Sequence, residues 1–412
     1  MQAAEQAAEQ AKAQTIALAK EALEFAQQNK KLFVHIIGIT LIVIILGAML
    51  SYVSIKMRLL KTNCSNLNVI PSAVNLNSSW ITSADPVNQH PIRDFYIKTA
   101  YNCCSTGAFS NDYVGTCALE YVIKQGCRCL DFEIYGLSAG EPIISSSVID
   151  DRCLKETYNS VAFDDAMKII SISAFNTDPS RCPNPSDPLL LHFRIKTNNV
   201  ATLNSMADSI KTHLESRMLP IDYGHENDGY NLCVTKVAEF LGKVIIIVQS
   251  TPLLYQNAST DANATANASA DAAANNNSKN RLFEITNLTS NSAFARCLTN
   301  FNVINSPDIT ELIEYNKQKM TVVLPDDDSN YNPIPPSLAG CQCIAMCFQY
   351  YSDGNLAIYN AMFDKGPNNS AFLLKPQNMW FVPQTINVPA PQDPKLTFAS
   401  RDLTSPMYKF TV

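Results

Sequence analysis

The chain has 412 residues, of which 46% are hydrophobic and 17% are charged. That length accommodates one large domain with attached segments. A net charge of −6 argues against the basic surface that nucleic-acid-binding proteins carry, so we expect no nucleic-acid partner. The 13 cysteines are scattered without paired Cys-x-x-Cys motifs, which argues against a structural zinc site.

Residues 1–31 are predicted to form a helical arm, because they are rich in Ala, Gln, Glu and Lys and contain no Gly or Pro. Ile16, Ala19, Leu23 and Ala26 follow the 3-4-3 spacing of a short coiled-coil seam. A solvated helix that leads into the next segment explains the same pattern, and both interpretations are open at this point.

Residues 32–55 are predicted to form a single transmembrane helix, because this run of 24 residues contains no charged side chain. At about 1.5 Å per residue the run crosses a bilayer with some tilt. It begins too far from the N-terminus to be a cleaved signal peptide. Residues 56–89 are then expected to form an extended connector.

The orientation of this span is not decided by charge. Lys20, Lys30 and Lys31 precede the span, while Lys56, Arg58 and Lys61 follow it, so the positive-inside rule is nearly tied. Asn-x-Ser/Thr triplets, which are glycosylation sites in lumenal and secreted proteins, favour a lumenal or external location of the large C-terminal part. They begin at Asn63, Asn77, Asn257, Asn263, Asn267, Asn276, Asn287 and Asn368.

From residue 90 to residue 250 the sequence alternates between strand-like and helix-like segments. The expected strands are 94–99, 130–135, 189–195 and 244–248, and the expected helices are 117–125, 163–175 and 201–214. Residues 244–248 are continuously apolar, as in a parallel strand that is covered on both faces. This alternation predicts an α/β fold with a parallel sheet and helices outside it.

Asp131 and Glu133 are two residues apart on the strand 130–135, so both side chains point to the same side. Two carboxylates on one face of an apolar strand are unfavourable unless a cation lies between them. The pattern predicts either a divalent-cation site with hard oxygen ligands or a strand with one solvated face.

Residues 256–280 consist largely of Asn, Ala, Ser, Thr and Asp without periodicity, which is typical of an exposed low-complexity loop. We assign residues 251–290 to this linker. Residues 291–380 contain a second set of strand and helix segments. Residues 381–412 are rich in Pro and are predicted to form an extended C-terminal tail.

Short motifs around these segments occur in a fixed order. They are Gly-Cys-Arg-Cys at 126–129, Glu-Pro-Ile-Ile at 141–144, Ser-Asn-Tyr at 329–331, Gly-Cys-Gln at 340–342, Phe-Gln at 348–349 and Leu-Lys-Pro at 374–376. Together they resemble the X and Y boxes of eukaryotic phosphoinositide-specific phospholipase C. The resemblance implies a distorted TIM (β/α)8 barrel, split by the linker into an X-like half at 90–250 and a Y-like half at 291–380. Its site would lie at the carboxyl ends of the strands.

The family cleaves a phosphodiester by general acid/base catalysis with two histidines and a calcium ion. The resemblance places these histidine positions at Tyr101 and Ser146. Neither side chain titrates near neutral pH, so neither carries a proton as His does. His192 alternates with Arg194 on the strand 189–195 and is either a replacement catalyst or a packed or hydrogen-bonded core residue.

The resemblance places the calcium ligands of the family at Asn102, Asp131, Glu133 and Arg194. A guanidinium at Arg194 would repel calcium, and it could replace the ion by pairing with both carboxylates. We therefore expect no metal or other cofactor, with calcium needed only if the chain is an active enzyme.

The phosphate-binding positions of the family are also changed. The resemblance places an arginine of the family at Pro325, next to aspartates at 326–328, and places further basic residues near Ile247 and Gln249. Three adjacent aspartates would repel a phosphorylated inositol headgroup.

These substitutions predict a pseudoenzyme, that is, a membrane-anchored and catalytically inactive phospholipase C-like barrel acting as a structural or binding module. The alternatives are an active phosphodiesterase that acts on a phosphoinositide or related lipid with rearranged residues, and a lipid or sugar-phosphate receptor without turnover. Tyr-Asn-Cys-Cys at 101–104 together with a single anchor is also similar to proteins of large DNA viruses of algae and protists. That similarity implies a glycoprotein of the virion membrane, with capsid or envelope proteins as partners besides the lipid bilayer.

Overall fold

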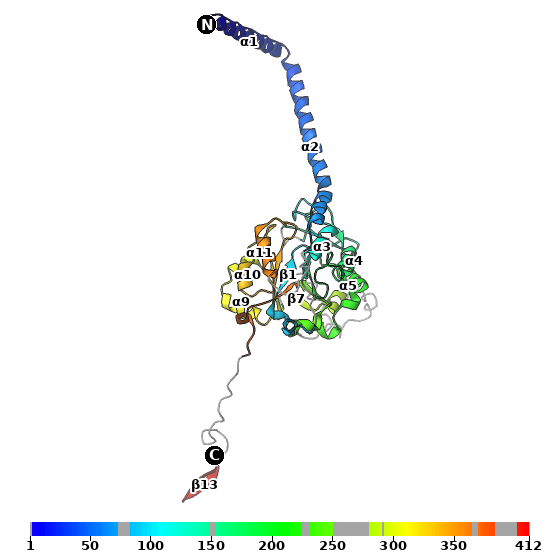
Figure 1. Ribbon diagram of the computed structural model, residues 1–412, viewed down its shortest axis with the longest axis vertical. Helices are drawn as coiled ribbons and strands as arrows, with labels where there is room; N and C mark the ends of the chain where they lie inside the picture. The colour runs from blue at the N-terminus through cyan, green and yellow to red at the C-terminus, as the bar shows by residue number, and fades with distance from the viewer. Residues whose placement is uncertain are drawn as a thin grey trace, which may run out of the picture.

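Eight parallel strands form a barrel and follow one another around it in sequence order. The barrel lies at the centre of the globular part of the molecule (Figure 1). The computed structural model describes residues 2–72, 83–148, 153–224, 231–249, 280–290, 292–364, 370–383 and 402–411. The strands are β1 (Phe95–Ala100), β2 (Cys129–Gly136), β5 (Leu189–Ile195), β6 (Val244–Gln249), β7 (Leu288–Ser290), β8 (Ala295–Thr299), β9 (Met320–Leu324) and β10 (Cys343–Met346).

The strands pair along the path β7-β6-β5-β2-β1-β10-β9-β8, so the barrel is nearly closed and β7 and β8 are the two ends of the path. β1 pairs with β2 on one side and with β10 on the other, in both cases parallel. The first and second halves of the chain therefore share one sheet. The predicted parallel barrel is confirmed.

Helices surround this barrel, as Figure 1 shows. They are α3 (Thr116–Lys124), α4 (Phe163–Ser173), α5 (Val200–Leu214), α7 (Arg281–Ile285), α8 (Asn300–Ile304), α9 (Ile309–Asn316), α10 (Ile334–Leu338) and α11 (Gly354–Phe363). Three short strands add antiparallel pairs to the sheet, namely β3 (Pro142–Ser145), β4 (Val161–Ala162) and β11 (Phe372–Leu374). Turns of 3-10 helix are η1 (Pro86–Gln89), η2 (Ile92–Asp94), η3 (Glu215–Arg217), η4 (Ile221–Tyr223), η5 (Leu232–Val234), η6 (Val237–Phe240) and η9 (Gln377–Met379).

Alternate residues of the strands face opposite sides of the sheet, which divides the core into two layers. Leu189 and Leu191 of β5 belong to the layer between the strands and the outer helices. Leu190 belongs to the layer inside the barrel, together with Cys129 of β2 and Ile245 of β6. The next inward positions of β2 and β5 are therefore Asp131 and His192, so the sequence pattern brings polar side chains into the upper part of the barrel.

The N-terminal arm is α1 (Gln2–Gln28), and α2 (Lys30–Val69) follows it. α2 contains the predicted span and is long and apolar enough to cross a membrane, and no residue of its most apolar stretch is buried. The prediction of an extended connector at 56–89 differs from the structure, because α2 continues to Val69. Residues 56–69 contain no Gly or Pro, and Leu67 is buried against the barrel, so nothing interrupts the helix before Pro71.

A disulfide joins Cys64 in α2 to Cys117 at the beginning of α3. The other cysteines are free thiols, and among them only Cys153 is exposed in the described part of the chain. The sequence analysis did not predict this bond. The sequence gives no signal of this pairing, because the two cysteines are 53 residues apart. One follows the predicted span and the other lies in a predicted helix.

Two of the predicted glycosylation sequons lie in described residues, and both Asn side chains are engaged in protein contacts. Asn63 Nδ2 donates to Asp112 Oδ1 at 3.3 Å. Asn287 is buried, and its Oδ1 accepts from the Ile246 amide at 2.8 Å. A glycan at either site would break these contacts. The remaining sequons lie outside the described residues, at Asn77, Asn257, Asn263, Asn267, Asn276 and Asn368.

The linker and the tail also differ from their predicted bounds. Residues 251–279 lie outside the described residues, but the predicted linker extended to 290, whereas α7 and β7 lie within 281–290. Asn280 caps α7 by accepting from the Leu282 amide, and β7 pairs with β6. In the predicted extended tail, β12 (Asp402–Ser405) and β13 (Tyr408–Thr411) form an antiparallel hairpin, because residues 406–407 form a turn between two short strands.

Limited proteolysis should cut first within residues 256–279 and leave two fragments that stay associated. β1 of the first half pairs with β10 of the second, so the two halves keep a common core after the cut. Size-exclusion chromatography of the nicked protein without denaturant tests this. Fragments that elute separately would show that the halves fold independently.

Candidate functional site

Inward-facing side chains of β2 and β5 form a buried charged cluster at the upper end of the barrel. Asp131 and Glu133 of β2 lie beside His192 and Arg194 of β5 in the parallel register. All four side chains are buried. Parallel strands carry their functional side chains at the carboxyl ends, and this cluster occupies that end.

Arg194 is the centre of the cluster. Its Nε lies 3.1 Å from Asp131 Oδ1, and its Nη2 donates to Asp131 Oδ2 at 3.0 Å. The same Nη2 donates to Asn102 Oδ1 at 2.6 Å, while Nη1 lies 3.7 Å from Glu133 Oε1. The guanidinium plane also covers the Tyr101 ring, with 4.5 Å from Cζ to the ring centroid. One cation therefore contacts both carboxylates and the Asn that follows β1.

Glu133 has further partners on two sides. Ser147 donates to it through its amide at 3.0 Å and through its hydroxyl at 2.8 Å. Lys196, the first residue after β5, places Nζ 3.9 Å from Glu133 Oε1. The two acids of β2 are thus balanced by Arg194 of β5 and by Lys196 directly after it, which removes the electrostatic need for a divalent ion between them.

His192 forms a hydrogen-bonded chain with two residues of the barrel interior. Its Nδ1 lies 2.7 Å from Asp131 Oδ1 and its Nε2 lies 3.2 Å from Ser290 Oγ at the end of β7. A carboxylate can only accept, so Nδ1 donates to Asp131. Both ring nitrogens are occupied, which corresponds to the hydrogen-bonded core residue that the sequence analysis considered for His192.

The surroundings of Asp131 fix its charge state. Burial acts to raise the pKa of this carboxyl, but the Arg194 guanidinium and the hydrogen bond from His192 outweigh burial and lower the pKa to about 2. Asn102 adds a backbone hydrogen bond to Asp131 Oδ2 at 3.2 Å, from a left-handed backbone with φ of 44°. Asp131 is therefore ionised over the physiological pH range.

The two positions that the family resemblance assigned to proton carriers lie at the edge of this cluster. Tyr101 is the aromatic partner of Arg194. Ser146 is buried, and its hydroxyl donates to the Phe109 carbonyl at 3.3 Å. Both side chains therefore pack or bond within the protein, and neither is an imidazole.

The position assigned to the phosphate-binding arginine, Pro325, is buried directly after β9. Two of the aspartates behind it serve as hydrogen-bond acceptors within the fold. Asp326 accepts from the Phe301 amide at 2.8 Å at the first turn of α8. Asp328 accepts from the Phe109 amide at 2.9 Å and so ties the loop after β1 to the second half of the barrel. Ile247 is part of the core inside the barrel.

The residues at the predicted calcium position do not fit a calcium ion. Calcium requires several oxygen ligands around one point, and the guanidinium of Arg194 already lies within hydrogen-bond distance of Asp131 and Asn102. In the described part of the chain, no group of three or more His, Cys, Asp or Glu side chains could hold a metal ion. The predicted cluster of Asp131, Glu133 and Arg194 is present as an assembly of ion pairs.

Motif residues at the opposite end of the barrel make structural contacts. Lys375 is buried, and its Nζ donates to the carbonyls of Arg93 at 2.7 Å and Gly340 at 2.6 Å. Gln342 donates to the Asn316 carbonyl at 2.7 Å. The Gly-Cys-Gln and Leu-Lys-Pro motifs therefore hold backbone segments together at the amino ends of β1 and β10, away from the charged cluster.

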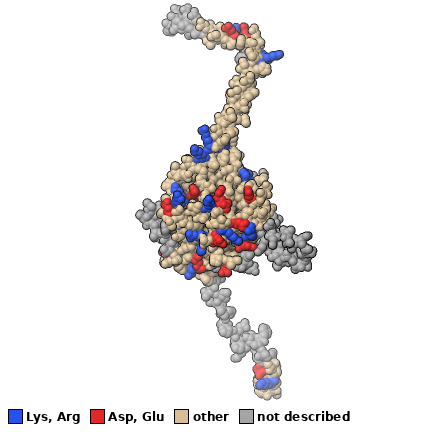
Figure 2. All heavy atoms as spheres, turned by 90° about the vertical axis from the view of Figure 1, so that its right-hand side faces the viewer, with Lys and Arg blue, Asp and Glu red and all other residues tan. Residues whose placement is uncertain are grey.

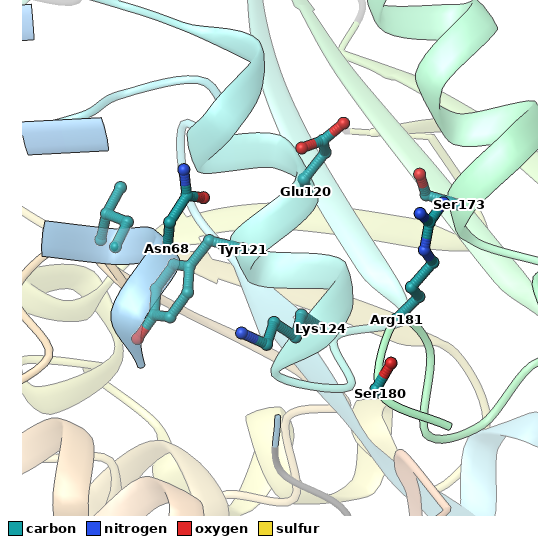
Figure 3. A pocket seen from close by; sticks show the side chains of 8 residues that line it. Asn68, Glu120, Tyr121, Lys124, Ser173, Ser180 and Arg181 are labelled. Atoms are coloured by element: carbon teal, nitrogen blue, oxygen red, sulfur yellow. The ribbon is translucent and has the colours of Figure 1, made fainter. Parts of the chain in front are cut away.

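A pocket of about 280 Å³ lies on the outside of the barrel and not over the charged cluster. Figure 3 shows Glu120, Tyr121 and Lys124 of α3 between Asn68 of α2 and Arg181. Lys124 Nζ donates to the Ile70 carbonyl at 2.5 Å, so its charge serves the junction of α2 with the barrel. This pocket lies at the interface between the end of α2 and the barrel.

Sequence reasoning missed three members of the cluster. Lys196 had a signal, because it lies two residues after Arg194, directly beyond the end of the strand, where the alternation of sides along a strand would continue. Ser147 follows Ser146 directly, but its bond to Glu133 depends on how the chain turns after β3. Ser290 had no signal, because it falls in the segment that was assigned to the linker.

Comparison with known proteins identifies the family to which this barrel belongs. The sequence model of the phosphatidylinositol-specific phospholipase C X domain matches residues 88–250, and that of the Y domain matches residues 264–378. The chain belongs to the phosphatidylinositol-specific phospholipase C family. The resemblance seen in the short motifs is thereby confirmed.

Two solved phospholipase C structures have the same fold. The crystal structures of S. officinalis PLC21 and L. pealei PLC21 are 20% and 19% identical to this chain, with TM-scores of 0.56 and 0.55. Each alignment covers 74% of this chain but only 39% and 40% of the respective structure. This phospholipase C family member thus spans less than half the length of those relatives, and the likeness concerns the barrel alone.

Curated relatives match over a shorter stretch. The mouse and human proteins named 1-phosphatidylinositol 4,5-bisphosphate phosphodiesterase eta-1 are each 38% identical over 69 residues. That stretch is 16% of this chain and 4% of each relative. The match supports membership of the phospholipase C family, and it covers too little of either protein to indicate the activity of this chain.

Proposed function

We propose that this chain is a membrane-anchored, catalytically inactive phospholipase C-like barrel that acts as a structural or binding module. The observation that carries the proposal is the position of Arg194, whose guanidinium bonds Asp131 and Asn102 at the calcium position that the family resemblance implies. An internal cation of this kind satisfies the carboxylates without an ion that could bind a phosphate oxygen.

The proton-carrier positions support the same proposal. Acid/base catalysis of phosphodiester cleavage needs groups that gain and lose protons near neutral pH, and Tyr101 and Ser146 occupy the two positions that the resemblance implies. His192 is the imidazole inside the barrel, but Asp131 and Ser290 engage both of its ring nitrogens. An active phosphodiesterase with rearranged residues would have to free one of them.

The anchor in this proposal is α2, whose apolar side chains are exposed along residues 34–55. A continuous apolar surface of this length is typical of a membrane span. The disulfide between Cys64 and Cys117 supports a location of the barrel on the lumenal or external side, because such bonds persist in oxidising compartments. The similarity to proteins of large DNA viruses extends the proposal to a virion membrane, which mass spectrometry of purified particles tests.

The decisive test is a lipid hydrolysis assay with the full chain in vesicles that contain phosphatidylinositol or phosphatidylinositol 4,5-bisphosphate. We expect no turnover with or without millimolar-range calcium, and no calcium-dependent rise in melting temperature. Turnover that Asn102→Ala abolishes would overturn the proposal and support the active phosphodiesterase. Asn355→Ala is the matched control, since Asn355 lies in α11 and bonds the Asn330 carbonyl outside the cluster.

A further inference from the structure

The hairpin of β12 and β13 has two faces of different chemistry. Its register pairs Leu403 with Phe410 and Ser405 with Tyr408, and residues that face each other across an antiparallel pair lie on the same face. The rings of Tyr408 and Phe410 are neighbours on that face, with 5.5 Å between their centroids. We call the surface formed by Leu403, Ser405, Tyr408 and Phe410 the apolar face of the hairpin.

The opposite face is polar and makes its contacts within the hairpin. It consists of Asp402, Thr404, Lys409 and Thr411. Asp402 accepts a hydrogen bond from Thr411 Oγ1 and lies 3.8 Å from Lys409 Nζ. Asp402 and Lys409 are the charged side chains of residues 402–411, so their charges balance and the hairpin has no net side-chain charge.

The apolar face is open to solvent in the single chain. Tyr408 is 59% exposed, Phe410 is 49% exposed and Leu403 is 37% exposed. Two strands of four residues each bury little surface between them, so a hairpin of this size is marginal in water unless a further layer covers its apolar side. We therefore expect a second surface to pack on this face.

Charge favours another hairpin as that surface. The whole chain has a net charge of −6. Figure 2 shows acidic and basic side chains over the visible face of the barrel, whereas the hairpin at the lower end of the view is mostly uncharged. Two hairpins can therefore approach each other without the repulsion between bodies of equal net charge. The apolar face contains no charged residue, so packing it against its own copy buries no charge.

The attachment of the tail allows two hairpins to meet. The tail leaves the barrel after η9, where Trp380 Nε1 donates to the Lys375 carbonyl at 2.8 Å. From Pro383 to Asp402 the chain can span at most about 60 Å. A domain of about 300 residues has a radius of gyration of about 19 Å, so two barrels can lie side by side, about 50 Å apart, with their hairpins within reach of each other.

We infer that the C-terminal hairpin is a self-association surface, whose apolar face packs against the same face of a second copy of this chain. The two hairpins form two layers about 10 Å apart, related by a twofold axis. The contact is much smaller than the about 1,200 Å² of a stable interface, so it depends on the high local concentration of copies in one membrane. In this respect the inference rests on the anchor in the proposed function.

Thiol cross-linking of the full chain in phosphatidylcholine vesicles tests this surface. All variants carry Cys153→Ser, which removes the exposed free thiol of the described chain, and the dimer yield of Cys153→Ser alone is subtracted as background. The probe is Ser405→Cys on the apolar face. The matched control is Thr404→Cys, its neighbour on the polar face. A bis-maleimide that bridges about 10 Å, the spacing of two packed sheets, links copies that meet, and denaturing gels measure the covalent dimer.

We expect at least three times as much dimer from Ser405→Cys as from Thr404→Cys. Adding Phe410→Ser to Ser405→Cys should lower the yield at least threefold, because it removes an aromatic ring from the apolar face. Adding Thr411→Ser on the polar face should leave the yield unchanged. Equal yields from the two thiol positions, or a yield that Phe410→Ser does not lower, would overturn the inference, since the copies would then meet through another part of the chain.

Two further measurements separate the other outcomes. Vesicle flotation tests the anchor by itself. If the chain does not float, the anchor is refuted, and the same probes are read in solution at raised protein concentration, where equal yields again overturn the inference. Ser405→Cys labelled with the fluorophore NBD tests lipid as the occupant of the apolar face. Quenching by a headgroup nitroxide without dimer assigns the face to the membrane, and neither quenching nor dimer assigns it to another protein. Both results refute self-association.

Discussion

Replacing Arg194 with alanine is expected to lower the free energy of unfolding by about 3–5 kcal/mol. The substitution leaves Asp131 and Glu133 buried on the same face of β2 without the guanidinium that pairs with both. Removing one partner of a buried ion pair is costly because the remaining charge has lost its compensation. Chemical denaturation of the native chain and the variant measures the difference. Arg296→Ala is the matched control, since its pair with Glu311 is largely exposed and contributes about 1 kcal/mol or less.

Calcium should partly restore the stability of the Arg194→Ala variant. The variant keeps Asn102, Asp131 and Glu133, which are oxygen ligands of the kind that calcium prefers, and a ligand that binds the folded state raises its stability. The melting temperature should rise with calcium in this variant and not in the native chain. Arg194→Ala combined with Asp131→Asn should lose the response. A calcium-dependent rise in the native chain would refute the role of Arg194 as the internal cation.

The penalty in this variant should also depend on pH. In the native chain the pKa of Asp131 is about 2, below the unfolded value of about 3.9, so its stabilising contribution is present above about pH 4 and is lost as pH falls towards 2. Without Arg194, burial and Glu133 raise the Asp131 pKa. Asp131 of the variant is then protonated at a higher pH than Asp131 of the native chain, which relieves the repulsion between the two carboxylates. The difference in free energy of unfolding between the native chain and the variant should therefore narrow on acidification. A gap that stays constant from pH 7 to pH 4 would contradict this account.

Replacing Lys375 with methionine is expected to cost about 3 kcal/mol or more, although this residue lies far from the charged cluster. Its Nζ donates to the carbonyls of Arg93, Gly340 and Asn316. Methionine fills a similar volume but makes none of these three hydrogen bonds, each of which contributes about 0.5–1.5 kcal/mol. It also leaves the Gly340 carbonyl without the Lys375 donor, whereas Gln342 still donates to the carbonyls of Arg93 and Asn316. Burial lowers the pKa of Lys375 to about 7, and both forms of the amine donate hydrogen bonds.

Thermal unfolding of Lys375→Met beside Lys317→Met measures this effect. Lys317 pairs with Glu314 on the surface of α9, so its loss should change stability by less than about 1 kcal/mol. Similar melting temperatures for the two variants would show that the Leu-Lys-Pro motif is not structural. A large difference would show that the Leu-Lys-Pro motif serves the stability of the barrel.

The sequence predicted the barrel best where one physical signal dominated. The strand predicted at 244–248 extends only one residue further, to Gln249, because a continuous apolar run buried on both faces has few alternatives. β7 was missed, because its three residues include Thr289 and Ser290 and lie next to a low-complexity segment. The end of α2 was misplaced, because the absence of Gly and Pro in 56–69 permits a helix but does not show that the segment packs against α3.

The candidate site was predictable in its members and less so in its connections. Asp131, Glu133 and Arg194 were placed together by the period of two along strands and by the resemblance to phospholipase C. That resemblance also supplied Asn102, which has a left-handed backbone and whose side-chain Oδ1 accepts from Arg194. The bond from His192 to Asp131 depends on the register of β5 against β2, and register is a property of the assembled barrel.

The bond between Cys64 and Cys117 also determines how mechanical force would travel through the molecule. A pull between the N-terminal part of α2 and the barrel passes directly into α3 through two sulfur atoms, and the chain between the two cysteines carries no tension. While the bond is intact, the chain between the two cysteines adds nothing to the extension of the protein. After reduction, the part of this chain that precedes β1 would lengthen the connection by up to about 3.3–3.6 Å per residue. With the disulfide intact, a covalent cross-link couples α2 to α3. After reduction, only the main chain and noncovalent contacts connect α2 to the barrel.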